Sequence, residues 1–162
     1  MPNWCEGTFR ARGPLENIER FISEGLGCVS GNGENDFRIE KTTYDDDTVE
    51  FEVKGQDMAH IAGTKRHFLT FREWPYINVH QIEGSEGLFG FAAPFRAAWA
   101  IDLEAIASIA EQFFIKIRVN GFELGMQFAQ LIEVNEHGQV ICDSIMRYMD
   151  YEWECPMPLL GG

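Results

Sequence analysis

The stretch CEGTFRAR, residues 5–12, alternates small or apolar residues with polar ones. In an extended chain this alternation places Cys5, Gly7, Phe9 and Ala11 on one side, because successive side chains of a strand point in opposite directions. The other side carries Glu6, Thr8, Arg10 and Arg12. The stretch is therefore predicted to be a half-buried strand, in which Cys5 faces the core with Phe9 as a packing residue and not as a reactive thiol.

Two helices are predicted, and each follows a strand-like segment. Pro14 suits the first position of a helix, and apolar residues then recur at helical spacing up to Gly25. Later in the chain Asp102 can cap a second helix over residues 103–114, whose apolar residues, including Phe114, form one packing face. The helices therefore divide the ends of the chain into strand-helix units.

The middle of the chain, residues 30–88, is rich in strand-like segments. Residues 37–40 and 49–53 alternate as the two arms of a hairpin joined by the turn TTYDDDT. Two further strands are predicted over residues 66–74 and 76–84. We interpret this region as an insertion of β-hairpins.

The segment LFGFAAPFRAAWA has its aromatic residues, Trp99 included, on one side, and Pro94 within it predicts a sheet edge or a bulge. Asn120 and Gly121 form a typical hairpin dipeptide and predict a turn between two further strands. A last strand is predicted over residues 139–154, with its aromatic side buried and its acidic side in water.

The order of these elements predicts an α+β fold of the ferredoxin-like, split βαβ type: an antiparallel sheet with two helices on one face and an inserted set of β-hairpins. No linker, repeat or low-complexity segment divides the chain. We therefore expect residues 1–162 to form a single domain, which is long enough to bury a substantial core.

The charge balance is strongly acidic. Lys and Arg number 13 against 26 Asp and Glu, for a formal net charge of -13 at pH 7. Such a charge repels phosphate backbones and anionic membranes, so direct binding to nucleic acid or membranes is not expected, whereas a basic protein is a suitable partner. The chain has no apolar run of about 18 residues, the length of a membrane-spanning helix, and we expect it in the cytoplasm of a bacterial host cell.

No motif for catalysis, metal binding or a cofactor stands out. The cysteines lack the short spacings of a zinc site, and the histidines are dispersed. These residues are Cys5, Cys28, Cys142, Cys155, His60, His67, His80 and His137. We therefore expect free thiols, no metal, no cofactor and no enzymatic activity, although the many carboxylates leave a metal-dependent enzyme as an alternative.

Two acidic stretches are the candidate partner-binding residues. The last of them, YMDYEWE, interleaves aromatic with acidic residues, a mixture that suits an interface with Arg or Lys of another protein. The candidate residues are Asp45, Asp46, Asp47, Glu50, Glu52, Asp150, Tyr151, Glu152, Trp153 and Glu154.

Four stretches resemble one known family. The opening MPNWCEGTFRARGP, the later FRAAW and GFELGMQF, and the final DYEWE are similar to the YubB ferredoxin-like family of phage and plasmid proteins. In that family a proline usually follows the tryptophan shortly after, where this chain has WAIDLE. The resemblance implies a split βαβ core and an origin in a mobile genetic element, but no activity and no catalytic residues.

These observations lead to one main hypothesis and one alternative binding function. The main hypothesis is a small, acidic accessory protein of a phage or mobile element that binds a basic host protein and inhibits a CRISPR-type defence nuclease by mimicking nucleic acid. The alternative is a protein that binds or sequesters a small molecule or nucleotide, for which the basic residues Lys65, Arg66, Arg72, Lys116 and Arg118 offer modest patches. The exposed edge of an open sheet also makes a homodimer plausible.

Overall fold

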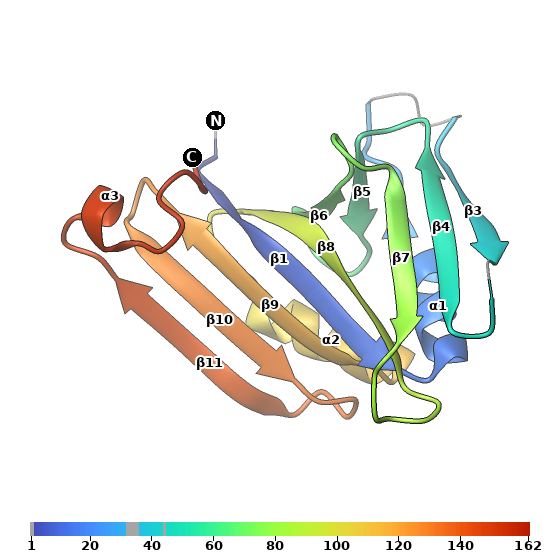
Figure 1. The fold of residues 1–162 in the computed structure, drawn as a ribbon. Coiled ribbons are helices and arrows are strands. Elements are labelled where there is room, and N and C mark those ends of the chain that lie inside the picture. Colours follow the sequence, from blue (N-terminus) through green and yellow to red (C-terminus); the bar gives the residue numbers. More distant parts are fainter. Residues whose placement is uncertain (1, 32–35, 44) are drawn as a thin grey trace.

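The computed structural model describes residues 2–31, 36–43 and 45–162, which form an α+β structure around a mostly antiparallel, open sheet (Figure 1). The elements in chain order are β1 (Trp4–Gly13), α1 (Leu15–Glu24), β2 (Leu26–Gly27), β3 (Arg38–Thr43), β4 (Thr48–Lys54), β5 (Met58–Ile61), β6 (His67–Thr70), β7 (Tyr76–Gln81), β8 (Phe89–Ala98), α2 (Leu103–Phe113), β9 (Lys116–Glu123), β10 (Phe128–Val134), β11 (Val140–Arg147) and α3 (Tyr151–Glu154). The predicted β-rich middle region is present and contributes β3 to β7.

The sheet runs in the order β11-β10-β9-β1-β8 and then divides. One end of β8 pairs with β7, which continues to β4 and β3, and the other end pairs with β6, which continues to β5 and β2. Pro94 lies between these two pairings, opposite Thr8 of β1. The missing N–H of Pro94 therefore falls where β8 has only one neighbour among the described strands, as its residue type predicts.

Helices α1 and α2 contact each other and lie on one face of the sheet (Figure 1). The core between helices and sheet is built on stacked rings: Phe9 of β1 lies 5.6 Å from Phe21 of α1 and 6.1 Å from Phe91 of β8, between ring centroids. Cys5 is fully buried in the same cluster. The prediction that Cys5 and Phe9 face the core is confirmed.

The predicted turn at Asn120-Gly121 is wrong, because β9 continues through both residues. Gly121 lies directly opposite Gly7 of β1, and a Cβ at this position would collide with the Sγ of Cys5. The glycine is needed for this close approach in the middle of a strand and not for a turn. The chain turns instead at residues 124–127, where the carboxylate of Glu123 accepts two backbone N–H groups.

Two aromatic residues predicted to pack are exposed. Trp99 and Phe114 both have positive φ angles, of 73° and 54°, and are 59% and 47% exposed. Phe114 is the left-handed C-cap of α2, and Trp99 follows the end of β8. Both side chains leave the apolar face because the backbone reverses at these residues, which the spacing of apolar residues does not reveal.

The predicted last strand is too long. Strand β11 ends at Arg147, and residues 151–154 form the short helix α3. Tyr151 of this helix is buried and donates its hydroxyl to the carbonyl of Leu160 over 2.8 Å, whereas Trp153 is 88% exposed. The aromatic residues therefore do not share one side, as a strand would require. Among the described helices, none is long and apolar enough to cross a membrane.

Candidate functional site

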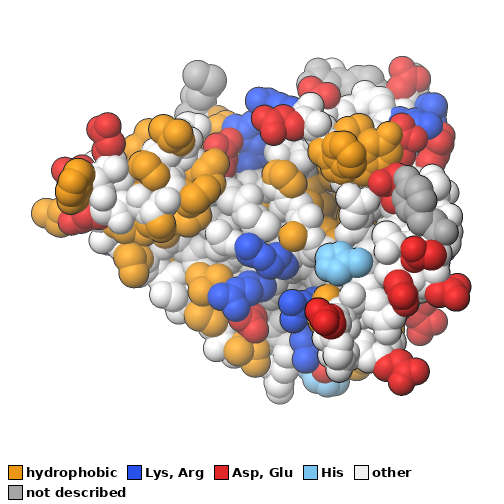
Figure 2. All heavy atoms as spheres, viewed as in Figure 1, with side chains coloured by type: hydrophobic (Ala, Val, Ile, Leu, Met, Phe, Trp, Pro, Cys, Tyr) orange, Lys and Arg blue, Asp and Glu red, His pale blue; other side chains and the backbone are white. Residues whose placement is uncertain are grey.

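The face of the sheet opposite α1 and α2 is open and carries a group of basic side chains. Because Phe9 of β1 points toward the helices, its neighbours Arg10 and Arg12 point to the open face. Strand β9 alternates in the same way, so that exposed Lys116 and Arg118 also lie on this face. Figure 2 shows Lys and Arg side chains gathered in the middle of the molecule, with Asp and Glu concentrated toward β3 and β4.

The register of β1 and β9 makes this group a two-by-two array, which we call the basic array: Arg10, Arg12, Lys116 and Arg118. Arg10 lies directly opposite Arg118, and Arg12 lies directly opposite Lys116. Like charges at directly opposite positions of neighbouring strands destabilise a sheet. The array is thus a local concentration of positive charge in a chain whose formal net charge is -13.

Acidic residues neutralise only part of the array. The guanidinium of Arg118 pairs with the carboxylate of Glu133 on β10 at 3.1 Å, and Lys116 lies 3.9 Å from the carboxylate of Glu136. The first pair is a cross-strand contact in register, and the second is long. Both are solvent-exposed pairs of the kind that contributes little to stability.

The other two members of the array have no acidic partner among the residues that the structure describes. Arg10 donates a hydrogen bond to the side-chain oxygen of Asn120 over 2.6 Å, which leaves its positive charge unneutralised. Arg12 forms neither an ion pair nor a side-chain hydrogen bond with any residue that the structure describes. These two guanidinium groups are available to a ligand, and guanidinium is the group that best matches phosphate or carboxylate oxygens.

The basic array lines a shallow hollow of about 890 Å³ on the open face. Apolar and aromatic side chains line the hollow beside the charges, among them Phe122 and Leu131. The full lining is Arg10, Arg12, Lys116, Ile117, Arg118, Asn120, Phe122, Ala129, Gln130, Leu131, Glu133, Ser144, Met146 and Tyr148. Cationic and ring-bearing side chains in one hollow suit a ligand with an anionic part and a flat, weakly polar part.

The predicted partner-binding residues do not form one surface. Asp45, Asp46 and Asp47 lie in the turn between β3 and β4, at one side of the molecule. Residues 150–154 form α3 and its cap beyond β11, at the opposite side (Figure 1). A single interface that uses both acidic stretches is therefore not available.

Three of the predicted contact residues are engaged within the chain. Glu50 is only 9% exposed and Tyr151 only 2%, so neither can form the centre of an exposed contact. Glu52 lies 3.1 Å from the ammonium group of Lys54. Thr48 and Glu52, on the same side of β4 as Glu50, are half-buried, so the alternation of the strand alone does not predict the burial of Glu50.

The acidic residues of α3 also serve the local backbone. The carboxylate of Asp150 caps the helix by accepting the N–H of Trp153 over 3.2 Å. Glu154 accepts the N–H of Met149 over 2.9 Å in return. The same carboxylate of Glu154 accepts the N–H of Asp150 over 3.3 Å. Asp150 and Glu154 therefore hold the backbone at the start of α3, although Glu154 lies one residue beyond the position of the acid in a capping box. Glu152 and Trp153 remain exposed.

The aspartates between β3 and β4 have acidic neighbours that the sequence did not indicate. The N–H of Gln81 donates to the carbonyl of Asp47 over 2.9 Å, which brings the β3–β4 turn beside the β7–β8 turn. A second, smaller hollow is lined by Asp47, Glu83 and Glu86. We call this group the acidic tip, and its members are Asp45, Asp46, Asp47, Glu83 and Glu86.

The cysteines of the chain are unreactive or unclustered where the structure describes their surroundings. All four cysteines are free thiols, as predicted. Burial, followed by the charges of Glu123 and Glu6, raises the pKa of the Cys5 thiol to about 12, so this sulfur stays protonated and unreactive. Within the described ranges, no three His, Cys, Asp or Glu side chains lie close enough to hold a metal ion.

Comparison with models of protein families, with curated proteins and with solved structures returned no match to this chain.

Proposed function

We propose that the protein binds a phosphorylated small molecule of the nucleotide class on the open face of its sheet. The observation that carries this proposal is the basic array: two directly opposed like-charge pairs, in an acidic chain, with Arg12 unpaired among the described residues. An anion bound across the array relieves the repulsion between the opposed cations and also accepts charged hydrogen bonds from them. Both effects favour binding.

The shape of the hollow favours a ligand with two unlike ends. Lys116 and Phe122 both lie on the open face of β9, and the six residue steps from one to the other span about 20 Å at the usual rise of a strand. A phosphate group held by Arg12 and Lys116 leaves the rest of the ligand to extend toward the Phe122 ring. Stacking of a flat base on an aromatic ring stabilises the complex in addition to the ion pairs.

A titration with defined probes tests this proposal. Isothermal titration calorimetry with ATP, sodium pyrophosphate and adenosine separates the contributions of phosphate and base. We expect ATP to bind more tightly than pyrophosphate, and adenosine to bind weakly. In the double variant Arg12→Gln/Lys116→Gln the affinity for ATP should fall by about tenfold or more, the usual effect of losing a charged hydrogen bond.

A matched control removes the same charge elsewhere. Lys65 and Arg72 are exposed and lie outside the hollow, so Lys65→Gln/Arg72→Gln should bind ATP like the unaltered protein. Equal losses in the two double variants would mean that only net charge matters, and the proposed site would be wrong. No heat of binding with either phosphate probe would also reject it.

We also propose that the centre of the fold is of the ferredoxin-like, split βαβ type. The strand order β9-β1-β8-β7, with α1 after β1 and α2 after β8, supports this assignment, and so does the antiparallel pairing of these strands. Membership of the YubB family, an origin in a phage or plasmid and the single-domain organisation of residues 1–162 remain predictions.

A second function is supported by the acidic tip. Five carboxylates lie on two adjacent turns, and such a concentration of negative charge suits the basic nucleic-acid channel of a host defence nuclease. The test is a pull-down from bacterial lysate with the unaltered protein and with Asp45→Lys/Asp46→Lys. A nuclease that only the unaltered protein retains, and that DNA displaces, supports mimicry. Equal recovery with both proteins would argue against it.

A further inference from the structure

Strand β11 is the last strand of the sheet, and its outer edge is unpaired among the described residues. The N–H of Tyr148, just after β11, donates to the carbonyl of Gln127 over 2.8 Å, on the side of β10. Because backbone groups of successive strand residues point to alternate edges, those of Asp143, Ile145 and Arg147 point outward. This edge is a template for one more strand.

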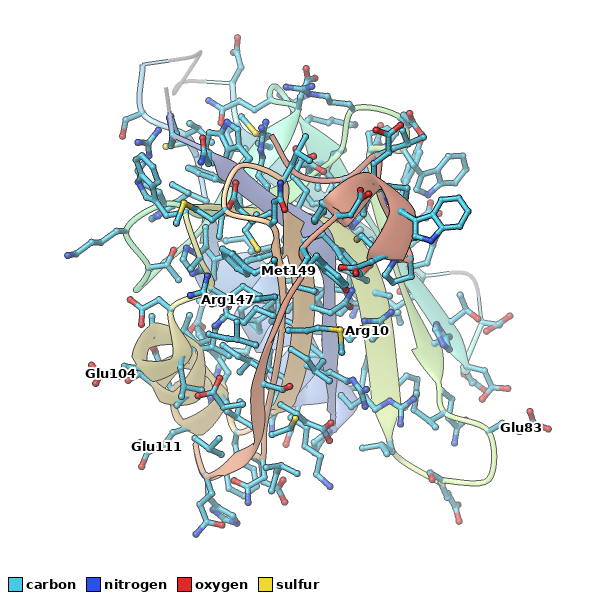
Figure 3. The ribbon with its side chains drawn as sticks, turned by 90° about the vertical axis from the view of Figure 1, so that its left-hand side faces the viewer. Arg10, Glu83, Glu104, Glu111, Arg147 and Met149 are labelled. Carbon is cyan, nitrogen blue, oxygen red and sulfur yellow. The ribbon has the colours of Figure 1, made fainter. Side chains whose placement is uncertain are left out.

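The side chains along this outward row are exposed and have no partner in the described chain. Asp143, Ile145 and Arg147 lie on the same side of the sheet, because they alternate with Ser144 and Met146. Figure 3 shows Arg147 on the side of α2, whereas Arg10 lies on the open side. Neither Asp143 nor Arg147 belongs to an ion pair within the residues described, and Ile145 is 56% exposed.

We propose that β11 pairs antiparallel with β11 of a second copy of this chain, about a two-fold axis at Ile145. In this register a residue that lies before Ile145 is opposite the residue of the second copy that lies the same number of positions after Ile145. Asp143 lies opposite Arg147 of the second copy, Arg147 lies opposite its Asp143, and the two Ile145 side chains meet between these ion pairs. Opposite-charge and apolar pairs at directly opposed positions both stabilise a sheet.

Other antiparallel registers do not have this complementarity. A two-fold axis at Asp143 places two aspartates opposite each other, and an axis at Arg147 places two arginines opposite each other. Both arrangements oppose like charges, which destabilises a sheet. Axes at Ser144 or Met146 set Ile145 against a charged side chain. The sequence of β11 therefore matches itself in one register, which commits the edge to a second copy and not to an unspecified partner.

Apolar side chains beyond the row extend the same surface. Met149 is 91% exposed just after β11, and Ile141 is 61% exposed at the bulge near the start of the strand. In the proposed register these two residues come opposite each other at both ends of the paired segment.

Charge swaps in β11 test the proposal. Analytical ultracentrifugation of the full chain at about 0.15 M salt, where distant charges are screened beyond about 8 Å, should give a mass that approaches twice 18.5 kDa as concentration rises. Asp143→Arg alone places four arginines across the two-fold axis and should weaken the dimer at least tenfold. Arg147→Asp alone places four aspartates across the axis and should also weaken the dimer at least tenfold.

Two combinations make the test specific. The double swap Asp143→Arg/Arg147→Asp restores opposite charges and should recover the dimer, and an equimolar mixture of the two single variants should form a mixed dimer. The control Glu24→Arg makes the same charge change on α1 and should have no effect. Monomeric behaviour of the unaltered chain up to about 1 mM would overturn the proposal. So would single variants that dimerise as well as the unaltered chain.

Discussion

The two faces of strands β1 and β9 differ in whether their side chains find favourable contacts within the folded chain. On the helix side, Phe9 stacks on neighbouring rings and Val119 is fully buried, so these side chains are packed in the core. On the open side, the next residues along the same strands are like charges placed directly opposite each other. The helix side explains why the chain folds. The open side has charges that folding alone does not need, and this excess is what points to a ligand.

The largest expected effect belongs to the helix side. Phe9→Ala removes a fully buried ring that stacks on Phe21, and should lower the free energy of unfolding by about 3–5 kcal/mol. Urea unfolding monitored by circular dichroism measures the change. Thr8→Ala, one residue away on the open side, is the control and should change stability by about 0.5 kcal/mol or less. An equal loss of unfolding free energy in Phe9→Ala and Thr8→Ala would show that the helix side does not contribute more to stability than the open side.

A pH effect of intermediate size is expected at a buried histidine on β6. His67 is 4% exposed, and its Nε2 accepts the N–H of Asp102 over 2.9 Å, which requires the neutral ring. Burial lowers the pKa of His67, and this outweighs the opposing influences of the Arg66 backbone and the Asp102 charge. Because the folded pKa is below the unfolded value, the unfolded state binds the proton more readily, and His67 contributes stability above about pH 6.5.

Stability should therefore fall as the pH is lowered from about 7.5 to 5.5, through the unfolded pKa of histidine. Urea unfolding at several pH values measures this dependence. In His67→Gln, which keeps an acceptor without a titrating ring, the dependence over this range should be smaller. The same slope in both proteins would show that other groups cause it.

The smallest effect on stability is expected on the open side of β1. Arg12→Glu replaces the like-charge pair with Lys116 by an opposite-charge pair, and should raise stability by about 0.2–1 kcal/mol. The same variant should lose affinity for ATP, because a carboxylate repels phosphate. Urea unfolding and calorimetry on one preparation measure both effects. A variant that is less stable and binds ATP normally would mean that the array serves the fold.

Strands and helices in which apolar residues recur regularly were predictable from the sequence. Which strands would pair with each other was not. The alternation of residues 5–12 located β1 and placed Arg10 and Arg12 away from the core. Nothing in the alternation indicated that Lys116 and Arg118 would lie opposite them, because the pairing of β1 with β9 depends on the whole topology. The sequence analysis therefore did not predict that these four basic residues form one array.

Local signals also failed where a residue type has two uses. Gly121 follows an asparagine as in a hairpin turn, yet it is required by the packing of Cys5 against the middle of β9. Asp150 and Glu154 resemble an acidic interface, yet they cap α3. In both cases the contact that decides between the two uses lies in the folded chain and leaves no distinct pattern in the local sequence.

A nuclear magnetic resonance titration of the isotope-labelled protein with ATP tests directly whether the open face of the sheet binds the ligand. We expect the largest shifts at Arg10, Arg12, Lys116, Arg118 and the Phe122 ring, with the helix side of the same strands unaffected. Shifts confined to the acidic tip or to α3, or no shifts at millimolar ATP, would contradict binding at the open face.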